Sequence, residues 1–358
     1  MRFVGQKDLK IGMRLAKPIY TEEGVLLYTR DTPITASVLT ALNNFNTYGQ
    51  YILEPAEPLP PMSEEELEYE RFTTVSCSNL KEDMLLMIDG KPPKNLDVLA
   101  ATICNNYGKL QNKITFIHTL RCPNDAIYKH GLSSGILAAL ISNKLGIDKK
   151  DQECLVKVGL LHDLGKLLAP KEILSNTGQL SPEELKQVRH CELQGLQLIK
   201  DNYAINAGVR RYITQLHIAL ENKINHREAD NTSILPGTKL LKVVDMFDTM
   251  CAMRVYKDPV SEFSAITYLL NNSSEFDEKI VMALCESIHI LPVGCCVELT
   301  TGEKGLVISE NEYYHLRPRV LVFSTNSIYD LGQKKVYEQI KIKDIMKTMD
   351  NRFVINPI

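Results

Sequence analysis

Histidines and aspartates recur through the middle of this 358-residue chain at intervals that suit a metal centre. The residues concerned are His130, the adjacent pair His162-Asp163, His190, His217 and Asp245. The successive intervals are 32, 27, 27 and 28 residues, where the second is counted from the aspartate of the pair. Each is about the length of one helix and its connection, so successive helices could each deliver one ligand to a common centre. Imidazoles and carboxylates together bind ferrous iron, manganese or zinc, and a carboxylate can bridge two ions.

The surroundings of two of the acids favour metal ligation. His162-Asp163 follows the apolar run 155–161, which is typical of a buried helix, and Asp245 follows the apolar run 240–244. A carboxylate inside a fold needs a partner, and a metal ion would supply one. His190 is expected on a helix that begins at Ser181-Pro182, with a Ser cap, Pro at the first helical position and acidic residues in the first turn.

Several short motifs in this region resemble one protein family. The segment resembles the HD-domain metallophosphohydrolases, and most closely the HD-GYP subgroup, whose members hydrolyse cyclic di-GMP. The likeness covers roughly residues 121–270, and the flanks also look like segments that accompany this domain in bacterial proteins. The matching pieces are Tyr128-Lys129-His130, His162-Asp163-Leu164-Gly165-Lys166, Glu172-Ile173-Leu174, His190-Cys191-Glu192-Leu193-Gln194-Gly195, Val244-Asp245-Met246-Phe247-Asp248 and Arg254-Val255-Tyr256.

The chain departs from the family pattern in its third block, which normally reads His-His-Glu and then Asp-Gly-x-Gly-Tyr-Pro. Counting back from Ile234-Leu235-Pro236-Gly237 aligns Leu216 with the first His and His217 with the second, and Ile224-Asn225-His226 occupies the Gly-Tyr-Pro. The glutamate that some members carry four residues before the first ligand is Ala126 here. The resemblance therefore implies two divalent ions, iron or manganese, rather than three. Their ligands would be His130, His162, Asp163, His190, His217 and Asp245.

The metal pattern predicts a hydrolase of phosphate esters, and cyclic di-GMP as its substrate is implied by the resemblance alone. Asp163 would bridge the two ions that activate a water molecule, and Lys166, one helical turn from His162, would hold a phosphate oxygen. Asp163 and Lys166 are thus the expected catalytic residues, and Lys166 and Arg254 the expected substrate-binding residues. The alternative interpretations are a solvated lysine at a helix end for Lys166 and a structural salt bridge for Arg254. Asp248 is interpreted as a local hydrogen-bonding residue.

Three functions stay open at this stage. The first is a dinuclear phosphodiesterase for cyclic di-GMP or a related cyclic dinucleotide. The second is a degenerate domain that binds metal or nucleotide without catalysis and works as a signalling module with a protein partner. The third is a hydrolase of a different nucleotide. A homodimer is a further candidate assembly, which the sequence does not decide.

Composition narrows the classes of partner and compartment. A formal net charge of -3 argues against a non-specific surface for polymeric nucleic acid. Nine cysteines without a CxxC pair indicate reduced thiols rather than a disulfide framework. Because no run approaches ~18 apolar residues and the N-terminus lacks an apolar signal core, we expect a cytoplasmic protein without a membrane span.

The pattern of elements predicts a mainly α fold in four parts. Residues 1–55 are expected to form a small β-rich module, and the four prolines within 55–61 favour a boundary. Residues 56–120 are interpreted as a linker and helical segment, and 121–290 as the HD-type helical bundle. Residues 291–358 alternate strand-like runs with turn signals, which predicts a small antiparallel β segment.

Overall fold

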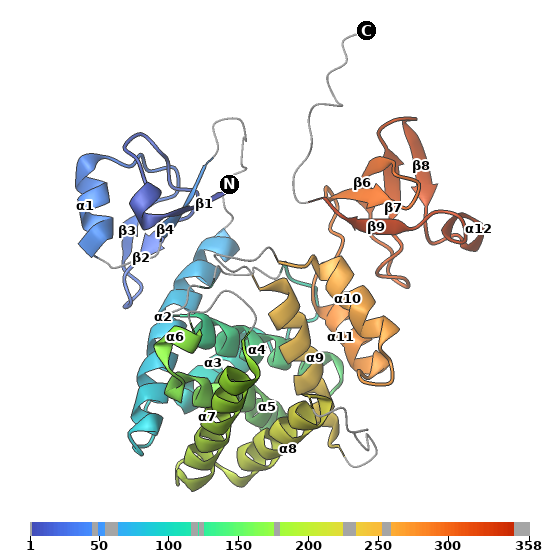
Figure 1. The fold of residues 1–358 in the computed structure, drawn as a ribbon. Coiled ribbons are helices and arrows are strands. Elements are labelled where there is room, and N and C mark those ends of the chain that lie inside the picture. The colour runs from blue at the N-terminus through green and yellow to red at the C-terminus, as the bar shows by residue number, and fades with distance from the viewer. Residues whose placement is uncertain are drawn as a thin grey trace.

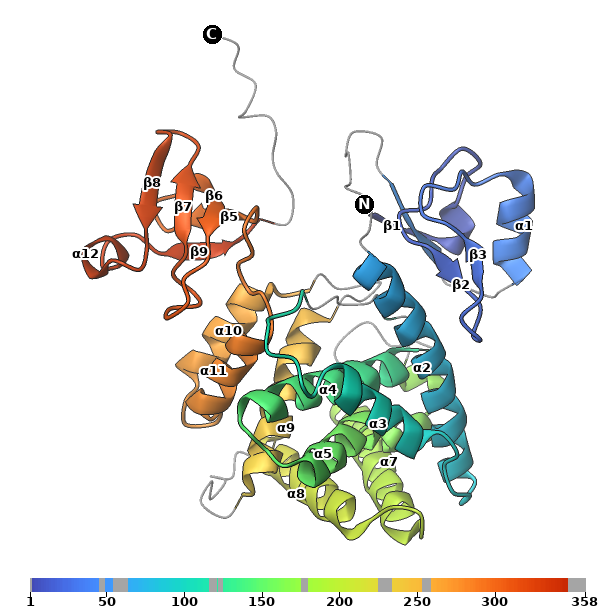
Figure 2. The ribbon, with the colours of Figure 1, turned by 180° about the vertical axis from the view of Figure 1, so that it is seen from behind.

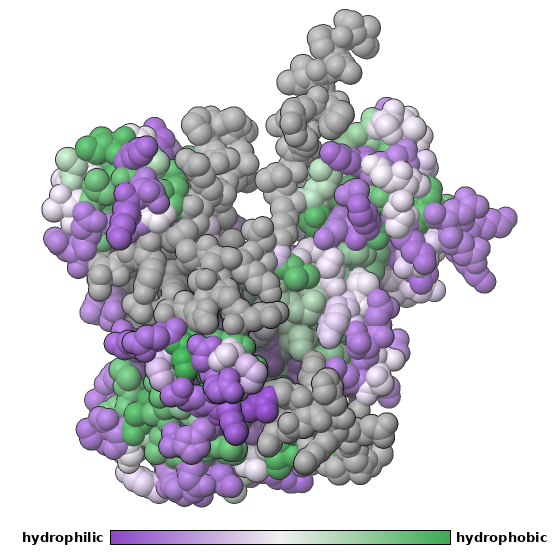
Figure 3. Space-filling view, viewed as in Figure 1, coloured by the Kyte–Doolittle hydropathy of each residue, from purple (hydrophilic) through white to green (hydrophobic). Residues whose placement is uncertain are grey.

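A computed structural model describes residues 2–44, 49–53, 64–115, 121, 125–174, 180–224, 234–252 and 259–346. A helical bundle forms the body of the molecule, and two small β-containing units stand at one end of it (Figures 1 and 2). The mainly α fold with β-rich ends agrees with the sequence-based expectation. Within the described residues, no helix combines the length and apolar character needed to cross a membrane. On the face drawn in Figure 3, hydrophilic and hydrophobic residues are interspersed over the bundle.

The N-terminal unit combines two small antiparallel sheets with one helix. Strand β1 pairs with β4, and β2 pairs with β3 across a turn that contains Gly24 at φ +81°. A hydrophobic cluster that includes the buried Leu15, Ile34 and Leu42 holds the unit together. The sequence predicts the β2–β3 turn, the helix and the last strand, but not β1. The elements are β1 (Arg2–Gly5), the 3-10 helix η1 (Gln6–Asp8), β2 (Ile19–Tyr20), β3 (Leu26–Tyr28), α1 (Ala36–Asn44) and β4 (Gly49–Ile52).

This unit packs along the first long helix of the bundle, α2 (Glu64–Ile88). Lys17 forms an ion pair with Glu70 of α2 in a part-buried position. The Tyr20 hydroxyl lies 3.5 Å from the backbone oxygen of Leu67. The β2–β3 hairpin is therefore attached to the N-terminal half of α2.

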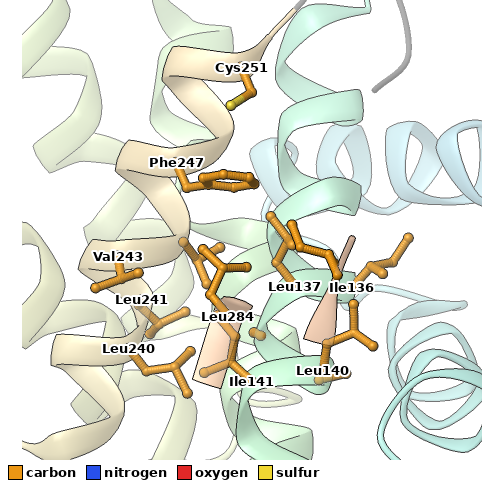
Figure 4. Close-up of a cluster of buried hydrophobic side chains, with 14 of the residues drawn as sticks. Ile136, Leu137, Leu140, Ile141, Leu240, Leu241, Val243, Phe247, Cys251 and Leu284 are labelled. Carbon is orange, nitrogen blue, oxygen red and sulfur yellow. The ribbon is translucent and has the colours of Figure 1, made fainter. Parts of the chain in front are cut away.

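The bundle is built around α4, which is buried along most of its length. Helices α2, α3, α5, α9 and α11 all pack against it. Figure 4 shows its apolar side chains Leu137 and Ile141 on the side of Phe247 of α9 and Leu284 of α11. The remaining elements are α3 (Leu96–Asn106), α4 (Ala126–Lys144), α5 (Lys149–Leu161), the 3-10 helix η2 (Leu164–Leu168), α6 (Lys171–Leu174), α7 (Pro182–Asp201), α8 (Ala207–Ile224), α9 (Pro236–Cys251), α10 (Glu262–Asn271) and α11 (Glu278–Ser287).

Local signals in the sequence explain where these helices begin and end. Helix α7 starts with a full capping box, in which the Ser181 side chain accepts from the backbone of Glu184 and the Glu184 side chain accepts from the backbone of Ser181. Asp148 caps α5 by accepting from two backbone amides. Gly146 follows α4 at φ +66°, a conformation that glycine adopts without strain. The start of α7 at Ser181-Pro182 matches the predicted one.

The C-terminal unit is a five-stranded antiparallel sheet with strand order β8-β7-β6-β5-β9. Its inward side chains, such as Val297, Val307 and Val320, join the hydrophobic cluster of the bundle. The sequence predicts the first three strands, whereas β8 and β9 have too little apolar alternation to be recognised. All eight cysteines within the described residues are free thiols. The elements are β5 (Cys296–Leu299), β6 (Lys304–Ser309), β7 (Arg319–Val322), β8 (Ser327–Asp330), α12 (Lys334–Tyr337) and β9 (Ile342–Ile345).

Candidate metal centre

Three side chains from distant parts of the chain converge at one point of the bundle. His130 comes from the first half of α4, His162 directly follows α5, and Asp245 lies in α9. The Nε2 atom of His130 is 3.0 Å from Nε2 of His162 and 3.2 Å from Oδ1 of Asp245. Nε2 of His162 is 3.5 Å from the same carboxylate oxygen. These atoms could all bind one ion, since they lie within 4.8 Å of one another.

The outer nitrogen of each imidazole has its own hydrogen-bond partner. Nδ1 of His162 lies 2.9 Å from the backbone oxygen of Gly159, so this nitrogen carries a proton and donates. Nδ1 of His130 donates in the same way to Oδ2 of Asp248 at 2.5 Å. Metal-binding histidines in proteins are typically oriented by such a bond from the other ring nitrogen. Both Nε2 atoms are therefore turned toward the centre.

Asp248 is itself held by a buried cation. Nη2 of Arg121 lies 2.5 Å from the carboxylate oxygen that His130 contacts, and both Asp248 and Arg121 are buried. Burial would raise the pKa of Asp248, but the Arg121 charge and the His130 contact lower that pKa to about 2. Asp248 thus stays anionic, and its hydrogen bonds reach residues distant in the chain rather than local ones. Arg121 could not be recognised from the sequence, because no pattern connects it to a partner so far along the chain.

Asp163 faces the same centre from the start of η2. Its carboxylate oxygens lie 3.7 Å from Nε2 of His130 and 3.7 Å from Nε2 of His162. Lys166 Nζ is 2.6 Å from Asp163 Oδ2. Burial opposes ionisation of Asp163, yet the nearby Lys166 and histidines lower its pKa. Lys166 is therefore ion-paired with Asp163, while its side chain stays one third exposed.

The centre has the charge and donor set of a cation site. Burial alone would lower the pKa of His130, but its hydrogen bonds to Asp245 and Asp248 raise that pKa to about 9. The carboxylates thus draw a proton onto His130 at the position where a metal ion would bind. Two imidazoles and two carboxylates suit ferrous iron, manganese or zinc. The residues His130, His162, Asp163 and Asp245 fit one divalent ion.

His217 and Leu216 lie side by side on α8. His217 is half-buried, and its pKa is lowered first by burial and then by the charge of the neighbouring His162. Leu216 is fully buried in the hydrophobic cluster. Helix α8 therefore brings one imidazole near His162, and an apolar side chain where the family places a second.

His190 is exposed on α7. The buried stripe of this helix consists of Cys191, Gly195 and Ile199 at four-residue spacing, so His190 lies on a different face. It is not part of the cluster around His130. Arg254 lies outside the described residues, and the ligand and substrate roles of these two residues stay predictions.

Helix α7 and η2 touch through two glycines. A Cβ atom on Gly195 would lie 2.3 Å from the Cα of Gly165, and one on Gly165 would lie 2.5 Å from the backbone oxygen of Cys191. Only glycines allow this close approach of the two backbones, which explains why each of the two motifs contains a glycine at this position. The contact brings Oε1 of Glu192 to 4.0 Å from Nζ of Lys166. The sequence analysis quoted Glu192 within a motif but assigned it no role.

Known proteins match the region that contains the centre. Residues 115–280 match the family described as HD domain. The chain is 25% identical over 275 residues to the cyclic di-GMP phosphodiesterase PA4108 of Pseudomonas aeruginosa, covering 75% of this chain and 66% of the relative. It is 25% identical over 166 residues to the 3'3'-cGAMP-specific phosphodiesterase 3 of Vibrio cholerae, covering 46% and 35% of the two chains. The alignments thus span less than two thirds of these relatives.

Among solved structures, Bd1817, an HDG"Y"P protein from Bdellovibrio bacteriovorus, is similar with a TM-score of 0.47 and 16% identity, over 79% of this chain and 97% of the other. The family match covers the residues that supply His130, His162, Asp163 and Asp245. It confirms the HD resemblance on which the sequence analysis relied. Residues 115–280 of this chain thus match the HD domain, and relatives of the chain are named as cyclic di-GMP phosphodiesterases.

Proposed function

We propose that the HD domain of this chain is a metal-dependent phosphodiesterase that hydrolyses a cyclic dinucleotide to a linear product. The observation that carries the proposal is the convergence of the buried His130, His162 and Asp163 and the half-buried Asp245 on a point that attracts a cation. The relatives named for cyclic di-GMP and 3'3'-cGAMP support the class of substrate. Cyclic di-GMP is the first candidate substrate.

Each residue of the centre has a role in this proposal. A divalent ion held there would supply a water molecule of lowered pKa and would offset negative charge on the phosphoryl oxygens. Asp248 and Arg121 hold the His130 ring so that Nε2 faces the ion. Lys166, whose side chain is one third exposed, presents a cation to a phosphate oxygen. Arg254 is proposed as a second substrate-binding cation.

Iron or manganese is the proposed metal, and the number of ions is part of the proposal. The first ion takes the four ligands named above. A second ion would share Asp163 and would take His217 and His190 as its other protein ligands. Because His190 is exposed and Leu216 is apolar, this second position has the weaker ligand set. We therefore expect the first ion to be retained more tightly than the second during dialysis.

The test is hydrolysis by protein purified without oxygen and loaded with ferrous iron or manganese, with metal content measured on the same sample. Cyclic di-GMP and 3'3'-cGAMP are offered separately, and the linear dinucleotide and GMP are quantified. His162→Ala and Asp163→Ala should abolish turnover and remove the first ion. Lys166→Ala should lower turnover and keep the metal. Turnover by metal-free wild-type protein would rule out the mechanism.

A second candidate function is a binding module without catalysis. The buried Leu216 favours it, because an apolar side chain stands where the family carries a ligand. Equilibrium dialysis would then show nucleotide or metal binding with no product. A large gain of turnover in Leu216→His would mean that the natural site lacks this ligand for catalysis. If the wild-type enzyme is active and Leu216→His leaves the turnover unchanged, the main support for this candidate is removed.

Cytoplasmic location, a signalling-protein partner and a homodimer belong to the same proposal. A protein that degrades a diffusible cyclic dinucleotide would act where that molecule is made, which favours the cytoplasm. Cell fractionation tests the location. Light scattering of the purified chain at several concentrations tests the homodimer, and a mass that stays at one chain throughout would contradict it.

A further inference from the structure

Lys166 lies between two carboxylates. Its Nζ is 2.6 Å from Asp163 Oδ2 and 4.0 Å from Glu192 Oε1. Asp163 lies beside the histidines of the centre, whereas Glu192 belongs to α7. The side chain of Lys166 is 33% exposed, which leaves it room to turn. One ammonium group can therefore pair with either acid.

Asp163 faces two cations that compete for it. Its Oδ2 atom lies 3.7 Å from Nε2 of His130, at the side where a metal ion would bind, and also accepts from Lys166. A divalent ion on this carboxylate would come within a few ångströms of the ammonium group. At such a separation two like charges repel by about 1 kcal/mol or more even in a watery environment. Metal binding therefore weakens the ion pair between Lys166 and Asp163 and favours a second partner for the ammonium group.

Glu192 is placed to receive the displaced ammonium group. The contact between Gly165 and Gly195 fixes α7 against η2, so Glu192 is held one short side-chain rotation from Lys166. Its own side chain is partly buried, at 26% exposure. Among the described residues, the ion pairs of Lys166 involve these two acids.

We propose that Lys166 is a displaceable cation, which moves from Asp163 to Glu192 when a metal ion binds the centre. Glu192 is then a positioning residue: it lowers the energy of the displaced lysine, and it holds the ammonium group beside the metal, where a phosphate oxygen would lie. The inference rests on the metal site of the proposed function, but it concerns metal affinity and not turnover.

A double-mutant cycle on metal affinity tests the exchange. The full chain is stripped of metal, and manganese binding is measured from the free ion by electron paramagnetic resonance. Lys166→Met removes the competitor, so we expect manganese to bind about tenfold more tightly. Glu192→Gln leaves Lys166 on Asp163, so we expect binding to weaken about tenfold in the natural background. In the Lys166→Met background, Glu192→Gln should change the logarithm of the manganese affinity by less than about a third of its change in the natural background.

Two outcomes would overturn the proposal. Equal weakening by Glu192→Gln in both backgrounds would mean that Glu192 acts only as a distant negative charge, and weaker binding in Lys166→Met would mean that the lysine does not compete. Glu183→Gln is the matched control, since it removes the same charge from an exposed position of the same helix and should leave affinity unchanged. Thermal unfolding of each variant separates lost folding from lost affinity.

The outcomes of the double-mutant cycle and of the turnover assay are independent of each other. Non-additive affinities with no hydrolysis of any cyclic dinucleotide would keep the exchange and reject the phosphodiesterase. Additive affinities in an active enzyme would do the reverse. If the exchange holds in an active enzyme, Glu192→Asp should keep most of the turnover that Glu192→Gln loses, with the change mainly in KM for the nucleotide.

Discussion

Asp248 accepts a hydrogen bond from Nδ1 of His130 at 2.5 Å, although the two residues are 118 positions apart in the chain. The same carboxylate oxygen lies 2.5 Å from Arg121. A buried anion thus connects a buried cation to the histidine that faces the centre. The orientation of His130 depends on this arrangement.

Asp248→Asn should weaken both metal binding and folding. The amide keeps the shape of the side chain but not its charge, so His130 loses its anionic partner, and we expect about 10- to 100-fold lower metal affinity. Arg121 would become an unpaired buried cation, at a cost of about 3–5 kcal/mol in the free energy of unfolding. Metal titration and denaturant unfolding measure the two effects. Asp201→Asn, at an exposed position of α7, is the control; an Asp248 variant with the control's affinity would disprove this role.

Metal removal should lower the melting temperature. A ligand at about a hundred times its Kd stabilises the folded state by about 2.7 kcal/mol, because it binds only that state. For a unit of about 150–250 residues this corresponds to about 5–10 °C in Tm. Differential scanning calorimetry with chelator and then with added manganese measures the shift. The metal-dependent shift should vanish in His162→Ala, and an equal shift in that variant would place the metal elsewhere.

Metal binding should release a proton. In the metal-free chain, burial alone would lower the pKa of His130, but its hydrogen bonds to Asp245 and Asp248 raise that pKa to about 9. His130 is thus protonated at neutral pH and must lose its Nε2 proton before that nitrogen can bind an ion. Affinity should therefore rise about tenfold per pH unit toward pH 9 and level off above it. Manganese titrations at several pH values check this, and affinity that does not change between pH 7 and 8 would contradict it.

Gly195→Ala should separate α7 from η2. The new Cβ would lie 2.3 Å from the Cα of Gly165, so the backbone must move. We expect a loss of about 1–3 kcal/mol in the free energy of unfolding, together with lower metal affinity as η2 shifts. Gln194→Ala, at the exposed neighbouring position, should change neither quantity by much. A stable Gly195→Ala protein with normal metal affinity would show that α7 and η2 can move apart without affecting folding or the centre.

The motifs and their intervals predict the helical HD domain and the burial of His162 and Asp163, because helix periodicity and caps are local properties. They also place His130 and Asp245 on separate helices, as the structure has them, and His162 directly follows a third helix. The Arg121–Asp248 pair could not be predicted, since it depends on how distant helices pack. The exposure of His190 could not be predicted for the same reason. The interval between ligands indicates which helix carries His190, whereas the face that α7 turns to the bundle depends on the contact between Gly165 and Gly195.

That glycine contact also determines how the centre can respond to its metal. With backbone against backbone, η2 and α7 are held in contact, whereas the side chain of Lys166 is one third exposed and can rotate. Rotations of exposed side chains take picoseconds to nanoseconds, whereas rearrangements of helices take microseconds or longer. The centre would therefore adjust to a bound ion by a fast side-chain rotation, and the backbone would have the same conformation with and without the metal.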